Sequence, residues 1–137
     1  MGIELGRFVK GWAAAALCCL ALGTPAKAHD LIAAYYALLA DVDLSNSSGV
    51  PLSHFCDVLQ QDRANVHRFG RAHELDDGDP LFHDPQLRGL IAPMCRAAGG
   101  FPVLADGLRQ FGSKYVYVQI YGHGQQMSDI VVSEGAG

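Results

Sequence analysis

Positive charge is scarce in this sequence. Its 137 residues include 10 Lys and Arg against 14 Asp and Glu, which gives a formal net charge of −4. Proteins that bind nucleic acids or anionic membranes usually present a basic face. The composition therefore argues against both kinds of partner and suits a basic protein or a cation better.

Motifs that carry a known chemistry are missing as well. The sequence has no nucleophile elbow, no phosphate-binding loop and no zinc-enzyme motif. It also has no internal repeat and no long low-complexity tract. These absences favour a small single domain without catalytic activity, and no cofactor is expected beyond a copper or zinc ion.

The first 28 residues are typical of an export signal. Arg7 and Lys10 precede an apolar run over residues 12–22, which is followed by a small-x-small sequence at residues 26–28. The run is shorter than the roughly 20 apolar residues that a membrane-spanning helix needs. A basic start, a short apolar middle and small residues at the end instead predict a signal peptide over residues 1–28. We expect the protein to work in the periplasm or outside the cell, without a membrane anchor.

The remaining residues, 29–137, are expected to form one acidic α+β domain. They carry 7 basic and 13 acidic residues, a formal charge of −6. Two of their residues are cysteines, Cys56 and Cys95, and both fall on apolar stripes of predicted helices. In an oxidising compartment we expect a disulfide between them, which would stabilise the fold by roughly 4 kcal/mol. The alternative is a pair of unpaired thiols in the core.

The clearest helical pattern covers residues 53–69. Its apolar residues recur every three or four positions, as one face of a helix requires. Ser53 can cap the first turn with its hydroxyl, and Gly70 can end the helix in the left-handed conformation. The apolar face consists of Leu52, Phe55, Cys56, Leu59, Val66 and Phe69.

Polar side chains interrupt this apolar face. Asp62 and Arg63 occupy positions where it should continue, and a buried charge must pair or reach water. The two residues therefore mark either an ionic contact to a neighbouring element or the lip of a groove. His67, four residues after Arg63, should resist protonation unless an acid lies nearby. Together with Asn65, these residues are candidates for binding a partner.

Two further helices are predicted before the C-terminal region. Alanine-rich residues 31–42 favour a helix, although the alternation over residues 38–44 also fits a strand. A longer helix is expected over residues 85–98, capped by Asp84 and kinked or ended at Pro93.

The C-terminal region changes from a helical to a strand pattern. Residues 101–111 keep helical spacing and can end at Gly112, whereas residues 115–121 and 127–133 alternate like two strands of a hairpin. A hairpin alone is marginally stable and must pack on other elements. We therefore expect an α+β fold, in which three to four helices pack on a C-terminal antiparallel β-hairpin or small sheet.

The first of these strands has two different faces. Its β-branched residues, Val116, Val118 and Ile120, should pack on the helices. Tyrosine offers a large rigid surface with a polar tip, so the opposite face is a candidate partner surface. Aromatic pairs that only stabilise the sheet are the alternative. This face carries Tyr115, Tyr117 and Tyr121.

Several segments contain metal-binding residue types. Residues 67–84 hold three histidines and five carboxylates, but their spacing matches no zinc or calcium signature and also suits a solvated loop. Residues 41–46 begin like a calcium loop, yet Asn46 stands where glycine is needed. After signal cleavage, His29 would offer an α-amine and an imidazole, two donors suited to Cu(II). The candidate ligands for copper or zinc are His29, His67, His73, His83 and His123.

These features favour a small exported protein without catalytic activity that binds a protein partner, as an accessory subunit, an inhibitor or an immunity-type factor does. The alternative is a periplasmic transition-metal-binding protein. A third hypothesis is an enzyme that uses Asp62, Arg63, Asn65 and His67. In it, Asp62 and Asn65 orient a reacting group or a water, and His67 is the base. The candidate partner-binding residues are Tyr115, Tyr117, Tyr121, Asp62, Arg63, Asn65 and His67.

Overall fold

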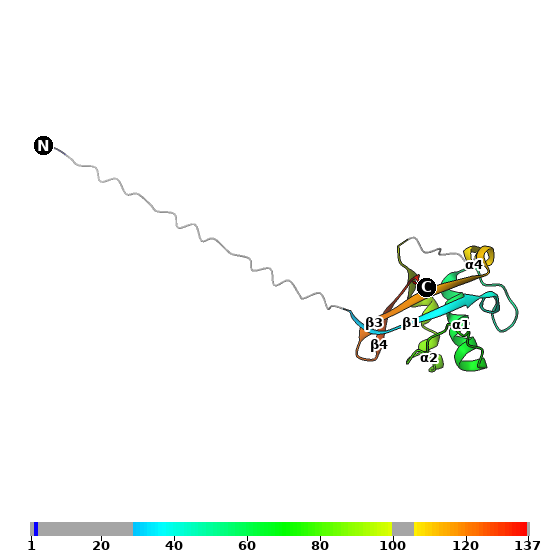
Figure 1. The fold of residues 1–137 in the computed structure, drawn as a ribbon. Coiled ribbons are helices and arrows are strands. Elements are labelled where there is room, and N and C mark those ends of the chain that lie inside the picture. The colour runs from blue at the N-terminus through cyan, green and yellow to red at the C-terminus, as the bar shows by residue number, and fades with distance from the viewer. Residues whose placement is uncertain (1, 3–28, 100–105, 137) are drawn as a thin grey trace.

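The computed structural model of the protein describes Gly2, residues 29–99 and residues 106–136. The predicted signal peptide therefore lies outside the described residues, apart from Gly2. In the part that is described, no helix is long and apolar enough to span a membrane. The same residues form four α-helices and a four-stranded sheet, which confirms the predicted α+β class (Figure 1).

The sheet is larger than the predicted C-terminal hairpin. Its strands lie in the order β1 (Asp30–Ala40), β3 (Ser113–His123), β4 (Gln126–Glu134) and β2 (Cys95–Ala97). β3 pairs with β1 and β4 in antiparallel fashion, and β4 pairs with β2 in parallel fashion. The hairpin of β3 and β4 is thus the middle of the sheet, and strands from earlier in the chain extend it on both sides.

The helix predicted over residues 31–42 is wrong, because this segment forms β1. Alternate side chains of β1, those of Tyr35, Ala37 and Leu39, expose at most 2% of their surface, and the strand pairs with β3 along its length. The helix preference of alanine is worth only a few tenths of a kcal/mol per residue, less than the burial of a strand face. The alternation over residues 38–44 persists to Ala40, where the 3-10 turn η1 (Asp41–Asp43) begins.

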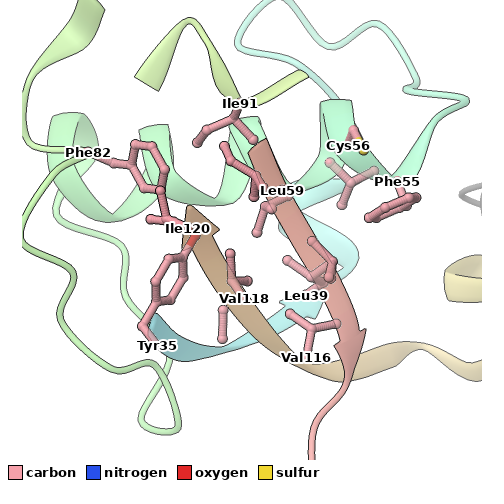
Figure 2. Packing of buried hydrophobic residues seen from close by; sticks show 14 of the residues in the cluster. Tyr35, Leu39, Phe55, Cys56, Leu59, Phe82, Ile91, Val116, Val118 and Ile120 are labelled. Carbon is pink, nitrogen blue, oxygen red and sulfur yellow. The ribbon is translucent and has the colours of Figure 1, made fainter. Parts of the chain in front are cut away.

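α1 (Phe55–Phe69) packs on the inner face of the sheet. It begins after His54 rather than at the predicted cap Ser53, and no side chain caps its first turn. Gly70 ends it as predicted, with a φ of 64°. Figure 2 shows the resulting core, in which the predicted inward residues of β3 meet α1. These fully buried residues are Val116, Val118 and Ile120 from β3 and Leu59 from α1.

The helix predicted over residues 85–98 is instead two short helices and a strand. α2 (Pro85–Arg88) begins as predicted, with the Asp84 carboxylate accepting a first-turn N–H at 2.7 Å. α3 (Ile91–Met94) follows, and the chain then enters β2. Pro93 lacks the N–H that a continuous helix needs, which weakens the helix at this point. Residues 95–97 instead pair with β4 as β2.

The predicted disulfide is present. It joins Cys56 in the first turn of α1 to Cys95 at the start of β2, and their Cα atoms lie 5.8 Å apart. The two cysteines are 39 positions apart in the sequence. The bond therefore fastens α1 to an edge of the sheet.

α4 (Asp106–Phe111) is the described part of the short helix predicted over residues 101–111. It ends as predicted at Gly112, whose φ is 77° and whose N–H donates to the Leu108 carbonyl at 2.8 Å. Leu108 is buried and belongs to the same core as α1. The other half of the prediction, residues 101–105, lies outside the described residues.

Candidate functional site

The second half of α1 carries a buried charged cluster. Asp62, Arg63 and Asn65 expose only 1%, 0% and 3% of their surface. Arg63 is the largest fully buried side chain of the described residues. Charges this deeply buried are rare and costly, so the groups around them decide what the cluster does.

The guanidinium of Arg63 is surrounded by aspartates. Its Nε donates to Asp62 Oδ2 at 2.7 Å, and its Nη1 donates to Asp79 Oδ2 at 3.2 Å and to the Asp77 carbonyl at 3.3 Å. Its Nη2 lies 3.6 Å from Asp76 Oδ1. Arg63 thus ties α1 to the loop that follows it, which is the ionic alternative of the two that the sequence left open.

Tyr35 connects the cluster to β1. The Arg63 guanidinium carbon lies 4.7 Å from the centroid of the Tyr35 ring, and the Phe82 ring meets the same ring nearly at a right angle. Figure 2 shows Tyr35 and Phe82 together beside α1. Burial raises the pKa of Tyr35 well above its usual value, so its phenol stays neutral.

His67 and Arg63 share one carboxylate. His67 Nε2 lies 2.6 Å from Asp79 Oδ2, the atom that also accepts from Arg63. Burial alone would raise the pKa of Asp79, but hydrogen bonds from His67 and the Phe82 N–H, with the charges of His67 and Arg63, hold it below its usual value. Asp79 is therefore the acid that bonds to both Arg63 and His67, which lie one helical turn apart on α1.

Two loop aspartates bind the backbone of β1. Asp77 Oδ2 accepts the N–H of Tyr36 at 3.0 Å, and the Asp77 N–H donates to the Tyr36 carbonyl at 2.9 Å. Asp76 Oδ1 accepts the N–H of Leu38 at 2.8 Å, while its Oδ2 accepts the N–H of His73 at 2.8 Å. These carboxylates hold the loop against the edge of the sheet and fix the backbone at His73.

Asp43 in η1 is a further fully buried carboxylate. Its Oδ2 accepts the N–H of Ala40 at 2.9 Å, and its Oδ1 accepts the side-chain amide of Asn65 at 2.8 Å. Asn65 is held in turn by Gln61, whose Nε2 donates to Asn65 Oδ1 at 3.0 Å. His73 Nε2 lies 3.5 Å from Asp43 Oδ2. Asp43 is thus fixed from two sides and faces an imidazole.

Asp43, Asp62 and His73 form the one group of three or more potential metal ligands found among the described residues. Their ligand atoms all lie within 4.8 Å of one another. Burial raises the pKa of Asp43 despite the hydrogen bonds from Ala40 and Asn65. Burial also raises the pKa of Asp62, to about 7, although the charge of Arg63 opposes the shift. Both carboxyls therefore lie where a negative charge is poorly solvated.

Unpartnered polar atoms gather in the same region. Four buried side-chain atoms in the described part of the chain lack a hydrogen-bond partner, and all belong to residues of or next to the cluster. A buried polar atom without a partner costs about 1–3 kcal/mol, so each one needs an explanation such as a functional role or a bound water or ion. They are Tyr35 Oη, Asp62 Oδ1, Arg63 Nη2 and His73 Nε2.

The histidines predicted to bind a metal do not come together in the structure. His29, which directly precedes β1, has its Nδ1 2.7 Å from Ser128 Oγ, whereas His67 contacts Asp79. His83 is exposed on the loop before α2. Of the predicted ligands, His73 alone belongs to the ligand group of the described residues.

The predicted partner-binding residues divide into two sets. Asp62, Arg63 and Asn65 are buried and bonded to other parts of the chain, so they offer no surface to a protein, and His67 is 16% exposed at its side chain. The tyrosines of β3 are half-buried on the face of the sheet turned away from the core. We call this surface the aromatic face, and it consists of Tyr36, Tyr115, Tyr117 and Tyr121.

Tyr36 of β1 completes the aromatic face. Its ring stacks on Tyr115 with centroids 5.3 Å apart and an angle of 10°, and it lies 4.7 Å from the ring of Tyr117. Tyr121 Oη accepts from Gln119 Nε2 at 3.1 Å. The cross-strand aromatic pairs proposed as the structural alternative are therefore present, and they hold the rings side by side.

Sequence reasoning missed Asp43 and Tyr36. Asp43 lies between the apolar residues Val42 and Leu44, a signal for a buried carboxylate, but its partner Asn65 is 22 residues away. The sequence predicts a helix at Tyr36, and a helix would not place it opposite Tyr117.

No protein-family model, curated protein or solved structure matches the chain.

Proposed function

We propose that the protein is a small exported, non-catalytic binding protein whose aromatic face docks a basic segment of a protein partner. The aromatic face is the observation that carries this proposal. It presents four tyrosines on the side of the sheet opposite the core, and their neighbours along β1 and β3 are fully buried. Tyrosine is enriched at binding hot spots because one ring combines apolar area with a hydroxyl.

The arrangement of the rings lowers the cost of binding. Tyr36 already stacks on Tyr115 and contacts the tilted ring of Tyr117, so little side-chain freedom remains to be lost when a partner docks. Antiparallel pairing between β1 and β3 fixes their backbones as well. A surface organised in this way can use most of its contact energy for affinity.

Charge next to the aromatic face favours a basic partner. Asp77 is exposed and hydrogen-bonds to the Tyr36 backbone. Burial, the negative charge of Asp77, the phenol of Tyr36 and then the negative charge of Asp76 raise the pKa of Tyr115. A lysine or arginine side chain over a tyrosine ring gains a cation–π contact of about 0.5–1 kcal/mol at an exposed site. Acidic groups beside the rings add attraction for the same cation.

The disulfide supports export. A bond between Cys56 and Cys95 is stable in an oxidising compartment such as the periplasm or the extracellular space. The predicted signal peptide over residues 1–28 points to the same location. The partner is therefore expected among exported proteins or exported segments of membrane proteins.

Capture of exported proteins on the immobilised protein tests the proposal. One partner should bind saturably, bind more weakly as salt is raised, and lose at least tenfold in affinity when Tyr117→Ala removes the central ring. Phe69→Ala is the matched control, because Phe69 is 40% exposed on α1 and lies outside the aromatic face. A partner that binds both variants equally well, or the lack of any saturable partner, would contradict the proposal.

A further inference from the structure

We propose that Asp43, Asp62 and His73 bind one divalent transition-metal ion of the Zn²⁺ class. The three residues come from η1, from α1 and from the loop after α1, and their ligand atoms lie within 4.8 Å of one another. The proposal differs from the histidine set predicted from the sequence and does not depend on the aromatic face.

The proposed ligands are held in place by a second layer of residues. Asp43 accepts from the Ala40 N–H and from Asn65, as described above. Asp62 Oδ2 accepts from Arg63 Nε, which leaves its Oδ1 for a ligand. The backbone of His73 is fixed by Asp76. Such outer contacts orient metal ligands and are worth about tenfold to a hundredfold in metal affinity.

Unpartnered atoms provide an independent reason for a bound ion. Asp62 exposes only 1% of its surface, yet its Oδ1 has no hydrogen-bond partner. His73 Nε2 has no hydrogen-bond partner either. His73 Nε2 lies 3.5 Å from Asp43 Oδ2, close to the spacing of about 3.3 Å between two ligands on a tetrahedral Zn²⁺ with bonds near 2.0 Å. One ion coordinated by both orphaned atoms and by Asp43 would remove both penalties.

The local charge also calls for a cation. Arg63 contacts the carboxylates of Asp62, Asp76 and Asp79, and a fourth carboxylate, that of Asp43, is bonded to Asn65 instead. All four side chains expose 1% or less. Buried carboxylates in excess of their cationic partners are costly, and a divalent ion compensates them. The His73 side chain is 25% exposed, which gives an ion a route to the buried carboxylates.

The ligand types select the metal. Two carboxylates and one imidazole, without a thiolate, suit a borderline first-row ion, and the imidazole disfavours Mg²⁺ and Ca²⁺, which prefer oxygen ligands. Three protein ligands leave at least one coordination position for water or for a group of a partner.

Zn²⁺ titration of the purified, chelator-treated, disulfide-intact protein tests the site. Calorimetry should show one saturable ion per chain, and NMR should show the ring resonances of His73 shifting with saturation while those of His67 and His83 do not. His73→Ala should weaken Zn²⁺ binding at least a hundredfold, and Asn65→Ala, which releases Asp43, about tenfold. His83→Ala is the matched control from the same loop and should leave the affinity within twofold.

The wild-type titration decides the question even if a variant fails to fold, because it needs no substitution. Absence of saturable Zn²⁺ binding to the folded protein overturns the proposal. Binding that shifts the ring of His29 but not that of His73 also overturns it, and would place the ion at the N-terminus of the processed chain. Equal affinity of the folded His73→Ala variant has the same meaning.

Discussion

The first turns of α1 and the turns that follow both contain buried side chains, but the surroundings of these side chains differ. Phe55, Val58 and Leu59 expose 1% or less and pack among apolar side chains of the sheet, whereas Asp62 and Arg63 are just as buried and depend on hydrogen bonds and ion pairs. Apolar packing has no required direction, but each charged group needs a partner at a particular distance and angle. One helix therefore shows two kinds of burial, one tolerant of small adjustments and one that fails when a single partner is lost.

The largest effect is expected for Arg63→Ala. Removing the guanidinium leaves Asp62 buried without its cation and Asp79 with His67 alone, and loss of one partner of a buried pair costs about 3–5 kcal/mol. The free energy of unfolding from urea denaturation, with the disulfide intact, measures this loss. A loss below about 1 kcal/mol would mean that the two halves of α1 do not differ as described.

Leu59→Ala should cost about 3 kcal/mol, through lost transfer energy and the cavity left in the core. A double-mutant cycle sharpens the comparison with the charged half. The losses of unfolding free energy caused by Leu59→Ala and Asp79→Asn should add up in the double variant. Those caused by Arg63→Ala and Asp79→Asn should not, because Arg63 and Asp79 are direct partners. Equal coupling in both cycles would argue against two separate kinds of burial.

The smallest effect is expected from the titration of Asp79, whose pKa is lowered in the folded protein. A carboxyl with a lowered folded-state pKa stabilises the fold above its unfolded-chain pKa of about 3.9, and this contribution disappears as the pH falls through the folded-state value. Asp79→Asn should therefore flatten the decline in unfolding free energy on the acid side of about pH 4. Asp41→Asn, at an exposed aspartate, serves as the control and should leave the decline unchanged.

The elements that could be predicted from the sequence are those specified by nearby residues. The periodicity of α1, its end at Gly70 and the hairpin of β3 and β4 depend on local spacing and turn chemistry. The disulfide followed from the number of cysteines and the expected compartment. The alanine content of β1 favours a helix, whereas its partner strand β3 lies about 80 residues later and leaves no local signal.

The charged cluster shows the same limit within a site. Asp62 and Arg63 interrupt an apolar face, and this local signal marks them in the sequence. Asp43 and Tyr36 take their roles from distant partners, Asn65 and Tyr117, and no local pattern marks such a pairing. The sequence therefore indicates the residues of each site that follow a local pattern, but not Asp43 and Tyr36, which only the fold brings next to them.

Asp76 and Asp77, which bind the backbone of β1, also bear on whether copies of the protein can pair through this strand. β1 is an outer strand of the sheet, and a free outer strand can recruit the same strand of another molecule into a growing aggregate. Asp76 and Asp77 occupy the amides of Leu38 and Tyr36, so this stretch of the strand has no donors left for an incoming copy. The loop after α1 thus blocks a common route to polymerisation along this stretch of β1.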